Sequence, residues 1–163
     1  MKKPEYKPEI CECCGQSKTY AIAIDRGTCD IMKAIAKYIG QKGINCVHPR
    51  KEMEGTYLTS NQVGNLSRPR MHGLIARVKG NPGNYLLTPK GAKFLKGVEI
   101  PKTAIVLKGT EQSDYRNVGY FNEDTDRCTI HDFADADEYW SGINYSVEEG
   151  RVVYDELEQK PLL

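Results

Sequence analysis

The 163-residue sequence has no apolar run long enough to cross a membrane, and its first ten residues lack the apolar stretch of a secretion signal. We therefore expect a cytoplasmic protein with no membrane partner. In that reducing compartment, the six cysteines favour metal binding or simple packing over disulfide bonds. The length suits one domain with appendages, which can bury a core without covalent cross-links.

The sequence also lacks the motifs of the common enzyme classes. Three histidines and no H-E-x-x-H leave little material for a hydrolytic zinc site, and neither a glycine-rich phosphate loop nor a Ser-His-Asp order is present. The single C-x-x-C motif is followed by a turn at 15–18 rather than by the helix that a thioredoxin-like redox site needs. We expect a protein that is not an enzyme and has no catalytic residues.

Local patterns are clearest between residues 58 and 97. Thr59 and Gln62 have the spacing of a capping box and predict the start of a helix. Pro69 interrupts this helix, because an interior proline removes a hydrogen bond and clashes with the preceding turn. Either the helix kinks there, or Ser67 caps a new one. The residues that fall near one helical stripe are Val63, Leu66, Arg70 and Leu74.

A hairpin and a further helix are predicted next. Short apolar runs at 75–78 and 85–87 bracket a turn-rich loop at 80–84, which is typical of a two-stranded hairpin. Thr88 before Pro89 predicts a helix start, because proline at the first helical position loses no hydrogen bond.

The flanking regions predict shorter elements. Apolar residues of the segment 28–43 recur at helical spacing and indicate a helix with one buried stripe. Residues 44–47 predict a short strand that pairs with the hairpin, and residues 49–54 a short second helix. Further short strands are expected at 104–107, 115–121, 128–133 and 143–147.

Two motifs in the central region resemble a known family. Gly73-Leu74-Ile75, the hairpin and then Leu87-Thr88-Pro89-Lys90-Gly91 are similar to MarR-like winged-helix DNA-binding domains, in which a recognition helix ending G-L-[IV] precedes a wing and L-T-x-x-G. The resemblance covers residues 28–97 and departs from the family pattern at Pro69. It implies an α+β winged helix-turn-helix and a transcription regulator that binds double-stranded DNA.

The net charge of +1 conceals a strong asymmetry. Residues 41–108 hold twelve lysines and arginines against three acids, whereas residues 109–163 hold four against fourteen. A basic stretch that coincides with the winged-helix pattern is what neutralisation of DNA phosphates requires. The residues expected to contact DNA are Asn61, Asn65, Arg68, Arg70, His72, Lys79, Asn81, Asn84, Lys90 and Lys93.

The N-terminal region contains a second chemical signal. Cys11 and Cys14, followed by Gly15, have the pattern of a zinc knuckle, in which two thiolates chelate one ion and the glycine lets backbone amides point at sulfur. Cys13 lies between them and is expected to be a spectator. We predict a structural zinc ion as the cofactor.

A closed zinc site needs two further ligands, and no second C-x-x-C exists. Cys128 with His131 has usable spacing and ranks first. Cys46 with His48 ranks second, and Cys29 alone third. The alternative is that these later cysteines are small buried hydrophobic residues.

The acidic C-terminal region contains eight of the fourteen aromatic residues, so we expect it to fold or to dock rather than to form a simple acidic tail. Asp135, Asp137, Tyr139 and Trp140 form an acidic and aromatic cluster that either binds a partner protein or packs in the core. The overall order of elements also resembles, more weakly, small phage and mobile-element proteins. That resemblance implies an alternative function, an inhibitor or adaptor that binds a host nuclease or polymerase.

The predicted organisation is therefore α+β in three segments. Residues 1–27 form a zinc-knuckle-like N-terminal segment, residues 28–100 a winged-helix domain, and residues 101–163 an acidic, aromatic-rich extension with short strands. The oligomeric state stays open, and a homodimer is one alternative.

Overall fold

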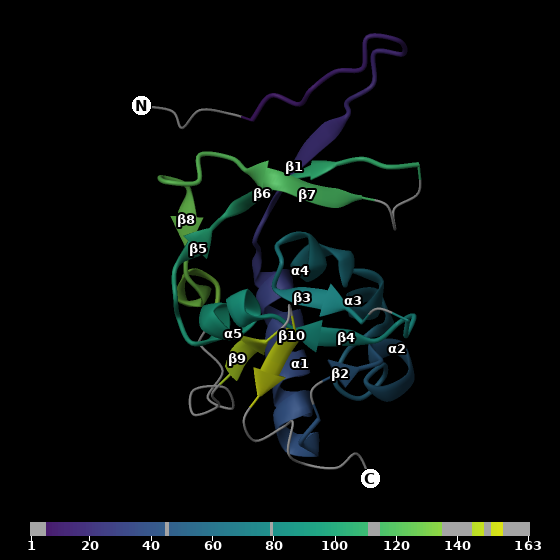
Figure 1. The fold of residues 1–163 in the computed structure, drawn as a ribbon, viewed down its shortest axis with the longest axis vertical. Coiled ribbons are helices and arrows are strands. Elements are labelled where there is room, and N and C mark those ends of the chain that lie inside the picture. The colour runs from purple at the N-terminus through teal and green to yellow at the C-terminus, as the bar shows by residue number, and fades with distance from the viewer. Residues whose placement is uncertain are drawn as a thin grey trace.

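The structure is a computed structural model that describes residues 6–44, 46–78, 80–110 and 115–134, together with the backbone of 145–148 and 151–154. Helices combine with small antiparallel sheets (Figure 1), so the predicted α+β class is confirmed. None of the helices in these ranges is long and apolar enough to span a bilayer.

Helix α1 (Arg26–Lys42) contributes one side of the main core. It begins after Asp25, whose side chain accepts a hydrogen bond from the backbone N–H of Thr28 at 2.8 Å, and it ends where Gly43 adopts a φ of 65°. The helix predicted over 28–43 is thereby confirmed, with its start two residues earlier. Its buried positions are Thr28, Cys29, Ile31, Met32, Ile35, Ala36, Tyr38 and Ile39.

A three-stranded antiparallel sheet packs in the same core as α1. Strand β2 (Cys46–Val47) pairs with β4 (Tyr85–Leu87), which also pairs with β3 (Ile75–Arg77), in the order β2-β4-β3. Both the predicted hairpin and the predicted pairing of 44–47 with it are confirmed.

Three short helices lie between β2 and β3. Helix α2 (Pro49–Glu52) confirms the short helix predicted at 49–54. Helix α3 (Ser60–Gly64) begins with the predicted capping box, in which Thr59 and Gln62 bond to each other's backbone amides. It stops at Gly64, however, and α4 (Ser67–Met71) starts as a separate helix.

The break between α3 and α4 resolves the alternatives at Pro69. This proline lies in the first turn of α4, where its missing N–H would have had no helical partner. Ser67 is the first residue of the new helix rather than its cap, because the preceding Leu66 occupies the cap position without a side-chain hydrogen bond.

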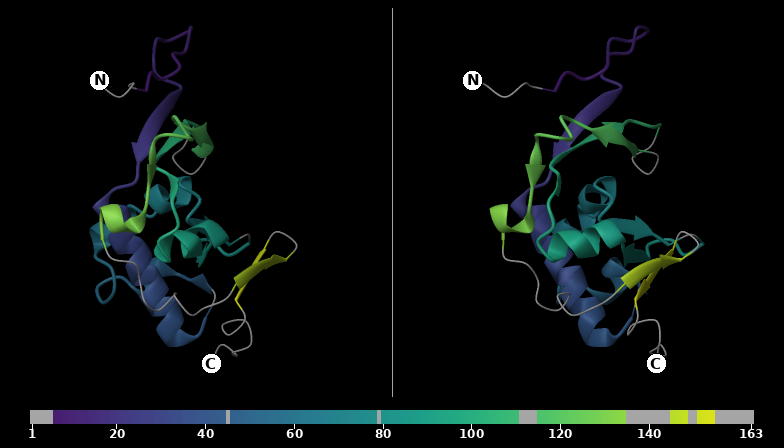
Figure 2. Two further views of the ribbon diagram at one scale, coloured as in Figure 1. Left: turned by 90° about the vertical axis from the view of Figure 1, so that its left-hand side faces the viewer. Right: turned by 60° about the vertical axis from the view of Figure 1, so that its left-hand side comes forward.

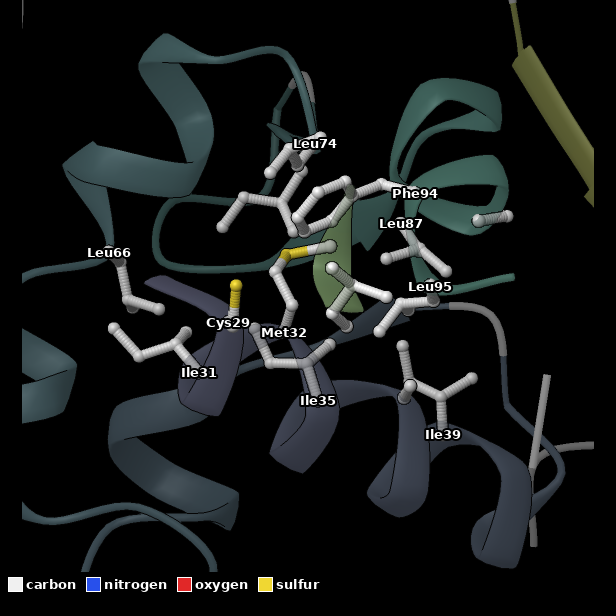
Figure 3. Close-up of a cluster of buried hydrophobic side chains, with 14 of the residues drawn as sticks. Cys29, Ile31, Met32, Ile35, Ile39, Leu66, Leu74, Leu87, Phe94 and Leu95 are labelled. Carbon is white, nitrogen blue, oxygen red and sulfur yellow. The ribbon is translucent and has the colours of Figure 1, made fainter. Parts of the chain in front are cut away.

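Helix α5 (Pro89–Leu95) starts as predicted. The Thr88 side chain accepts a hydrogen bond from the N–H of Gly91 at 3.0 Å, and its hydroxyl donates to the carbonyl of Gly73. Figure 3 shows how the side chains of α1 face those of α5 and β4 across the core; the labelled residues at this contact are Met32, Ile35, Ile39, Leu87, Phe94 and Leu95. Each buried apolar side chain contributes about 1.5–3 kcal/mol to stability.

A second sheet lies beyond α4, at the upper end of the molecule in Figure 1. Its order is β1 (Thr19–Ala23), β6 (Thr103–Leu107) and β7 (Arg116–Tyr120). Strands β6 and β7 confirm the predictions at 104–107 and 115–121, but β1 was not predicted. This sheet joins the first and third predicted segments of the chain.

Met71 of α4 connects the two parts of the fold. Its side chain packs with Ile22, Ala104 and Val106 of the second sheet, and its carbonyl accepts a hydrogen bond from the Asn117 side chain at 2.8 Å. Strands β6 and β7 are therefore part of the same packed structure as α4.

The remaining strands and a short 3₁₀ helix come after α5 in the chain. Strand β5 (Ile100–Pro101) pairs with β8 (Arg127–Cys128), and the 3₁₀ helix η2 (Ile130–Asp132) comes next. The strand predicted over 128–133 is therefore wrong beyond Cys128, because Thr129 and Asp132 form a capping box that starts a helical turn. Strands β9 (Tyr145–Glu148) and β10 (Arg151–Tyr154) form a hairpin near α5 (Figure 2), where a strand was predicted at 143–147.

Candidate nucleic-acid interface

The predicted basic surface contains a groove next to α4. The groove has a volume of about 220 Å³ and lies among α3, α4 and the hairpin strands β3 and β4. Its lining consists of Val63, Gly64, Leu66, Ser67, Arg70, Arg77 and Tyr85. Two arginines and a tyrosine hydroxyl in one shallow groove can hold a phosphate group, since the planar guanidinium presents paired donors to its oxygens.

Arg70 is the central cation of this groove. Burial lowers the pKa of its guanidinium, and the positive charge of Arg77 lowers it further, while Tyr85 and Tyr20 act in the opposite direction. Arg70 forms no ion pair with any carboxylate in the part of the chain that the structure describes. Two like charges held together in this way favour binding of an anion.

Arg70 was predicted from the sequence as a DNA contact, whereas Arg77 and Tyr85 were not. These two residues face each other directly across the β3–β4 hairpin, in the register Arg77↔Tyr85. The signal was present in the predicted hairpin, because pairing its two runs places these residues opposite one another. Their proximity to Arg70 depends on where α4 packs.

Arg68 occupies a different environment on the other side of α4. It lines a hollow of about 510 Å³ together with Tyr20, Asp25 and Asn65, and its Nη1 lies 3.2 Å from Oδ2 of Asp25. Both side chains are partly exposed, so this ion pair contributes at most about 1 kcal/mol. The contact compensates part of the positive charge that Arg68 would offer to DNA.

Asp25 is held ionised in this hollow. Burial acts to raise the pKa of its carboxyl, but hydrogen bonds from the backbone N–H and the hydroxyl of Thr28, together with the charge of Arg68, lower the pKa below its usual value. The same carboxylate therefore caps α1 and pairs with Arg68.

The predicted asparagine contacts lie on exposed surface. Asn61 and Asn65 are exposed on and just after α3, and the Asn65 amide donates to the carbonyl of Asn61 at 2.9 Å. In the hairpin turn Asn81 is exposed and Asn84 is half-buried. Lys79 lies outside the described residues.

The two lysines predicted on α5 differ in their surroundings. Lys93 is exposed. The Lys90 ammonium instead lies 4.2 Å from the ring centre of Tyr120 on β7 and donates a hydrogen bond to its hydroxyl. Lys90 therefore links α5 to the second sheet, and Lys93 is the more accessible cation.

The predicted contact of His72 with DNA is contradicted by its burial. Its side chain is 0% exposed, and neither ring nitrogen has a hydrogen-bond partner among the described residues. Burial lowers the pKa of His72 to about 4, with further lowering by Lys90 and Arg68 against the opposing effect of Asp25. His72 follows α4 directly and turns inward toward the core, so it does not reach a base or phosphate.

The predicted zinc-binding cysteines form a compact turn. The N–H groups of Cys14 and Cys13 and the thiol of Cys14 hydrogen-bond to Sγ of Cys11 and, with a smaller effect from Lys18, lower the pKa of the Cys11 thiol to about 7. Gly15 adopts a φ of 71°, in the left-handed region that favours glycine. Backbone amides directed at sulfur are the arrangement that supports a metal-bound thiolate.

The first-ranked second ligand pair is not close to this turn. Cys128 is buried in the main core near β5, and His131 lies on η2 beside Gly97. In Figures 1 and 2 the turn projects beyond the second sheet, well separated from β8. Among the described residues, no three His, Cys, Asp or Glu side chains are grouped to hold a metal ion.

The lower-ranked candidate metal ligands lie on other elements than the cysteine turn. Cys29 is buried on α1, where burial and then Cys128 raise the pKa of its thiol, as expected for a small core residue. Cys46 lies on β2, and Nδ1 of His48 accepts a hydrogen bond from the N–H of Lys51 at the start of α2.

The predicted protein-binding cluster of Asp135, Asp137, Tyr139 and Trp140 lies outside the described residues. Comparison of the chain with protein-family models, curated proteins and solved structures gives no significant match.

Proposed function

We propose that this chain is a cytoplasmic winged-helix transcription regulator, of the type found in phages and mobile elements, that binds double-stranded DNA. The groove formed by Arg70, Arg77 and Tyr85 carries the proposal, because it joins two guanidinium groups on the most basic part of the chain. The order of elements gives further support: a helix, a strand, short helices and a hairpin follow one another from α1 to β4, as in a winged helix.

The contacts divide by chemistry. Arg70 and Arg77 bind a phosphate, which positions the protein on the duplex without reading its sequence. Asn61 and Asn65, exposed along and just after α3, read base edges in the major groove, where asparagine pairs best with adenine. The exposed Asn81 and Lys93 lie on the flanking hairpin turn and α5 and contact the neighbouring backbone. His72 has no part in this interface.

The proposal also includes a structural zinc ion at Cys11 and Cys14. It is supported by the chelating spacing of the two thiols and by the backbone amides directed at Cys11. The ion would stabilise the N-terminal turn and take no part in a reaction.

The test of DNA binding is the salt dependence of affinity for a mixed-sequence duplex, measured by fluorescence anisotropy. For Arg70→Ala and Arg77→Ala, we expect weaker binding and a log–log salt slope smaller by about one for each lost phosphate contact. Lys37→Ala is the matched control, because it removes one positive charge from the exposed side of α1. It should leave the slope unchanged.

A wild-type protein that shows no salt-dependent DNA binding would contradict the proposal. Equal losses in Lys37→Ala and Arg70→Ala would also contradict it, since they would indicate attraction to net charge rather than to the groove. Affinity capture from nuclease-treated lysate distinguishes this proposal from the alternative, an inhibitor or adaptor that binds a host protein. An adaptor retains its protein partner after the nucleic acid is removed.

A further inference from the structure

The burial and position of each cysteine and histidine limit which of them can bind a zinc ion together. All six cysteines and all three histidines lie in the described parts of the chain. Cys29, Cys128 and His72 are buried in the interior. Cys46 lies on β2, His48 caps α2, and His131 lies on η2. Helix α2 and strand β2 lie at the opposite end of the molecule from the cysteine turn (Figure 1). The turn is thus the place where two thiols are presented together at the surface.

Backbone hydrogen bonds hold the cysteine turn in one conformation. The backbone bridge between Ile10 and Ser17 closes it, and hydrogen bonds join Cys11 N–H to the carbonyl of Gln16 at 2.8 Å and Gly15 N–H to the carbonyl of Cys11 at 2.9 Å. These bonds fix the backbone between the two thiols before any ion is bound. Pre-organised ligands lose little conformational entropy on binding, which favours chelation.

The position of the turn makes it accessible to another molecule. It projects beyond the sheet β1-β6-β7 (Figures 1 and 2), and its Cys14 side chain is exposed. Ile10, directly before Cys11, has 50% of its surface exposed. A second copy of the same turn would cover this side chain and bring two more thiols.

We infer that Cys11 and Cys14 form half of a zinc site, and that the same two residues of a second copy of this chain complete it. Zinc prefers four tetrahedral ligands, and four thiolates satisfy it at a Zn–S distance of about 2.3 Å. Each thiol gives its proton to solvent as it binds, so the centre carries two negative charges. Lys18, exposed at the base of the turn, supplies one compensating positive charge from each copy.

The resulting dimer has a twofold axis through the ion, because the two halves of the site are identical. This inference rests on the zinc site proposed above, but it does not depend on DNA binding. If both proposals hold, the two Arg70–Arg77 grooves are related by the same axis and address two symmetric half-sites on a duplex.

The experiment measures mass and metal together. Full-length protein purified with zinc is examined by size-exclusion chromatography with light scattering, and its metal content is determined by elemental analysis. We expect a dimer with one zinc per two chains. A strong chelator, under reducing conditions, should halve the mass while the far-ultraviolet circular dichroism stays the same, because the main core contains neither Cys11 nor Cys14.

Matched variants test the ligands. Cys11→Ser and Cys14→Ser should each lose zinc and become monomeric. Cys13→Ser, which changes another exposed thiol in the same turn, should keep both the metal and the dimer. Cobalt substituted for zinc should give the sulfur-to-metal absorption of a tetrahedral thiolate site in wild type and in Cys13→Ser.

Three results would overturn the inference. A monomer with one zinc per chain would show that the site closes within the chain, and the proposed zinc site would then survive without the dimer. A dimer that persists in a parallel chelation without reductant, and dissociates only when a reductant is added, would indicate a disulfide. A chain that binds no zinc at all would refute both the proposed zinc site and the zinc-linked dimer. DNA binding is measured separately, in the anisotropy assay.

Discussion

Replacement of Gly91 by alanine tests the contact between α5 and Leu74, which lies between α4 and β3. A Cβ atom at this position would lie 2.1 Å from the carbonyl oxygen of Leu74 and 2.9 Å from its carbonyl carbon. These are backbone atoms that cannot rotate away, and the same oxygen accepts a hydrogen bond from Thr88 N–H at 3.1 Å. Gly91→Ala therefore forces α5 away from the core, where Phe94 and Leu95 are fully buried.

The size of the effect follows from two opposing contributions. Overpacking of a buried contact costs about 1–3 kcal/mol, and a backbone clash this close belongs at the upper end. Alanine in a helix regains up to about 1 kcal/mol relative to glycine. We therefore expect a loss of about 2 kcal/mol, which lowers the melting temperature by about 4–8 °C for a chain of this length.

Thermal and urea unfolding followed by circular dichroism measure this loss. Gly64→Ala is the control, because Gly64 ends α3 on the surface and a Cβ there would meet nothing within 4 Å. We expect it to leave stability unchanged or raise it by about 0.4–1 kcal/mol. Equal stability of Gly91→Ala and Gly64→Ala would refute the close approach of α5 to Leu74.

Two further predictions concern charge. The unfolded chain protonates His72 below a pKa of about 6.5, whereas the folded protein resists protonation until pH 4. The free energy of unfolding should therefore decrease by about 3 kcal/mol as the pH falls through this window. In urea unfolding, His72→Met should lack this part of the decrease. If the variant and the wild type show the same pH profile, the burial of the imidazole is contradicted. Asp25→Asn keeps a side chain that can cap α1 but removes the ion pair with Arg68. We expect little change in melting temperature and tighter DNA binding with a salt slope steeper by up to about one; unchanged binding would show that Arg68 makes no phosphate contact.

The elements that were predictable from the sequence depend on residues close together in the chain. The capping box of Thr59 and Gln62, the helix start at Thr88 and Pro89, and the β3–β4 hairpin each arise from interactions within a few residues. The apolar spacing of α1 likewise identified its buried side. Such patterns are local consequences of backbone hydrogen bonding and side-chain periodicity, so one sequence is enough to detect them.

The interface and the metal ligands could be predicted only in part. The basic segment and Arg70 were visible in the sequence. The pairing of Arg70 with Arg77 was not, because it needs both the hairpin register and the packing of α4. The spacing of Cys11 and Cys14 indicated a chelating turn, but spacing between Cys128 and His131 carried no information on their distance from it.

Tertiary structure decided the rest. Strand β1 lacks a distinctive local pattern and is fixed by pairing with β6, some eighty residues later in the chain. His72 looked like an exposed polar residue, yet the short helix α4 ends just before it and directs its side chain into the interior. Such contacts form between residues far apart in sequence, and the burial of apolar surface outweighs the local preference of any one side chain. The sequence therefore determined the local elements and the basic and cysteine motifs, whereas packing determined which side chains remain at the surface.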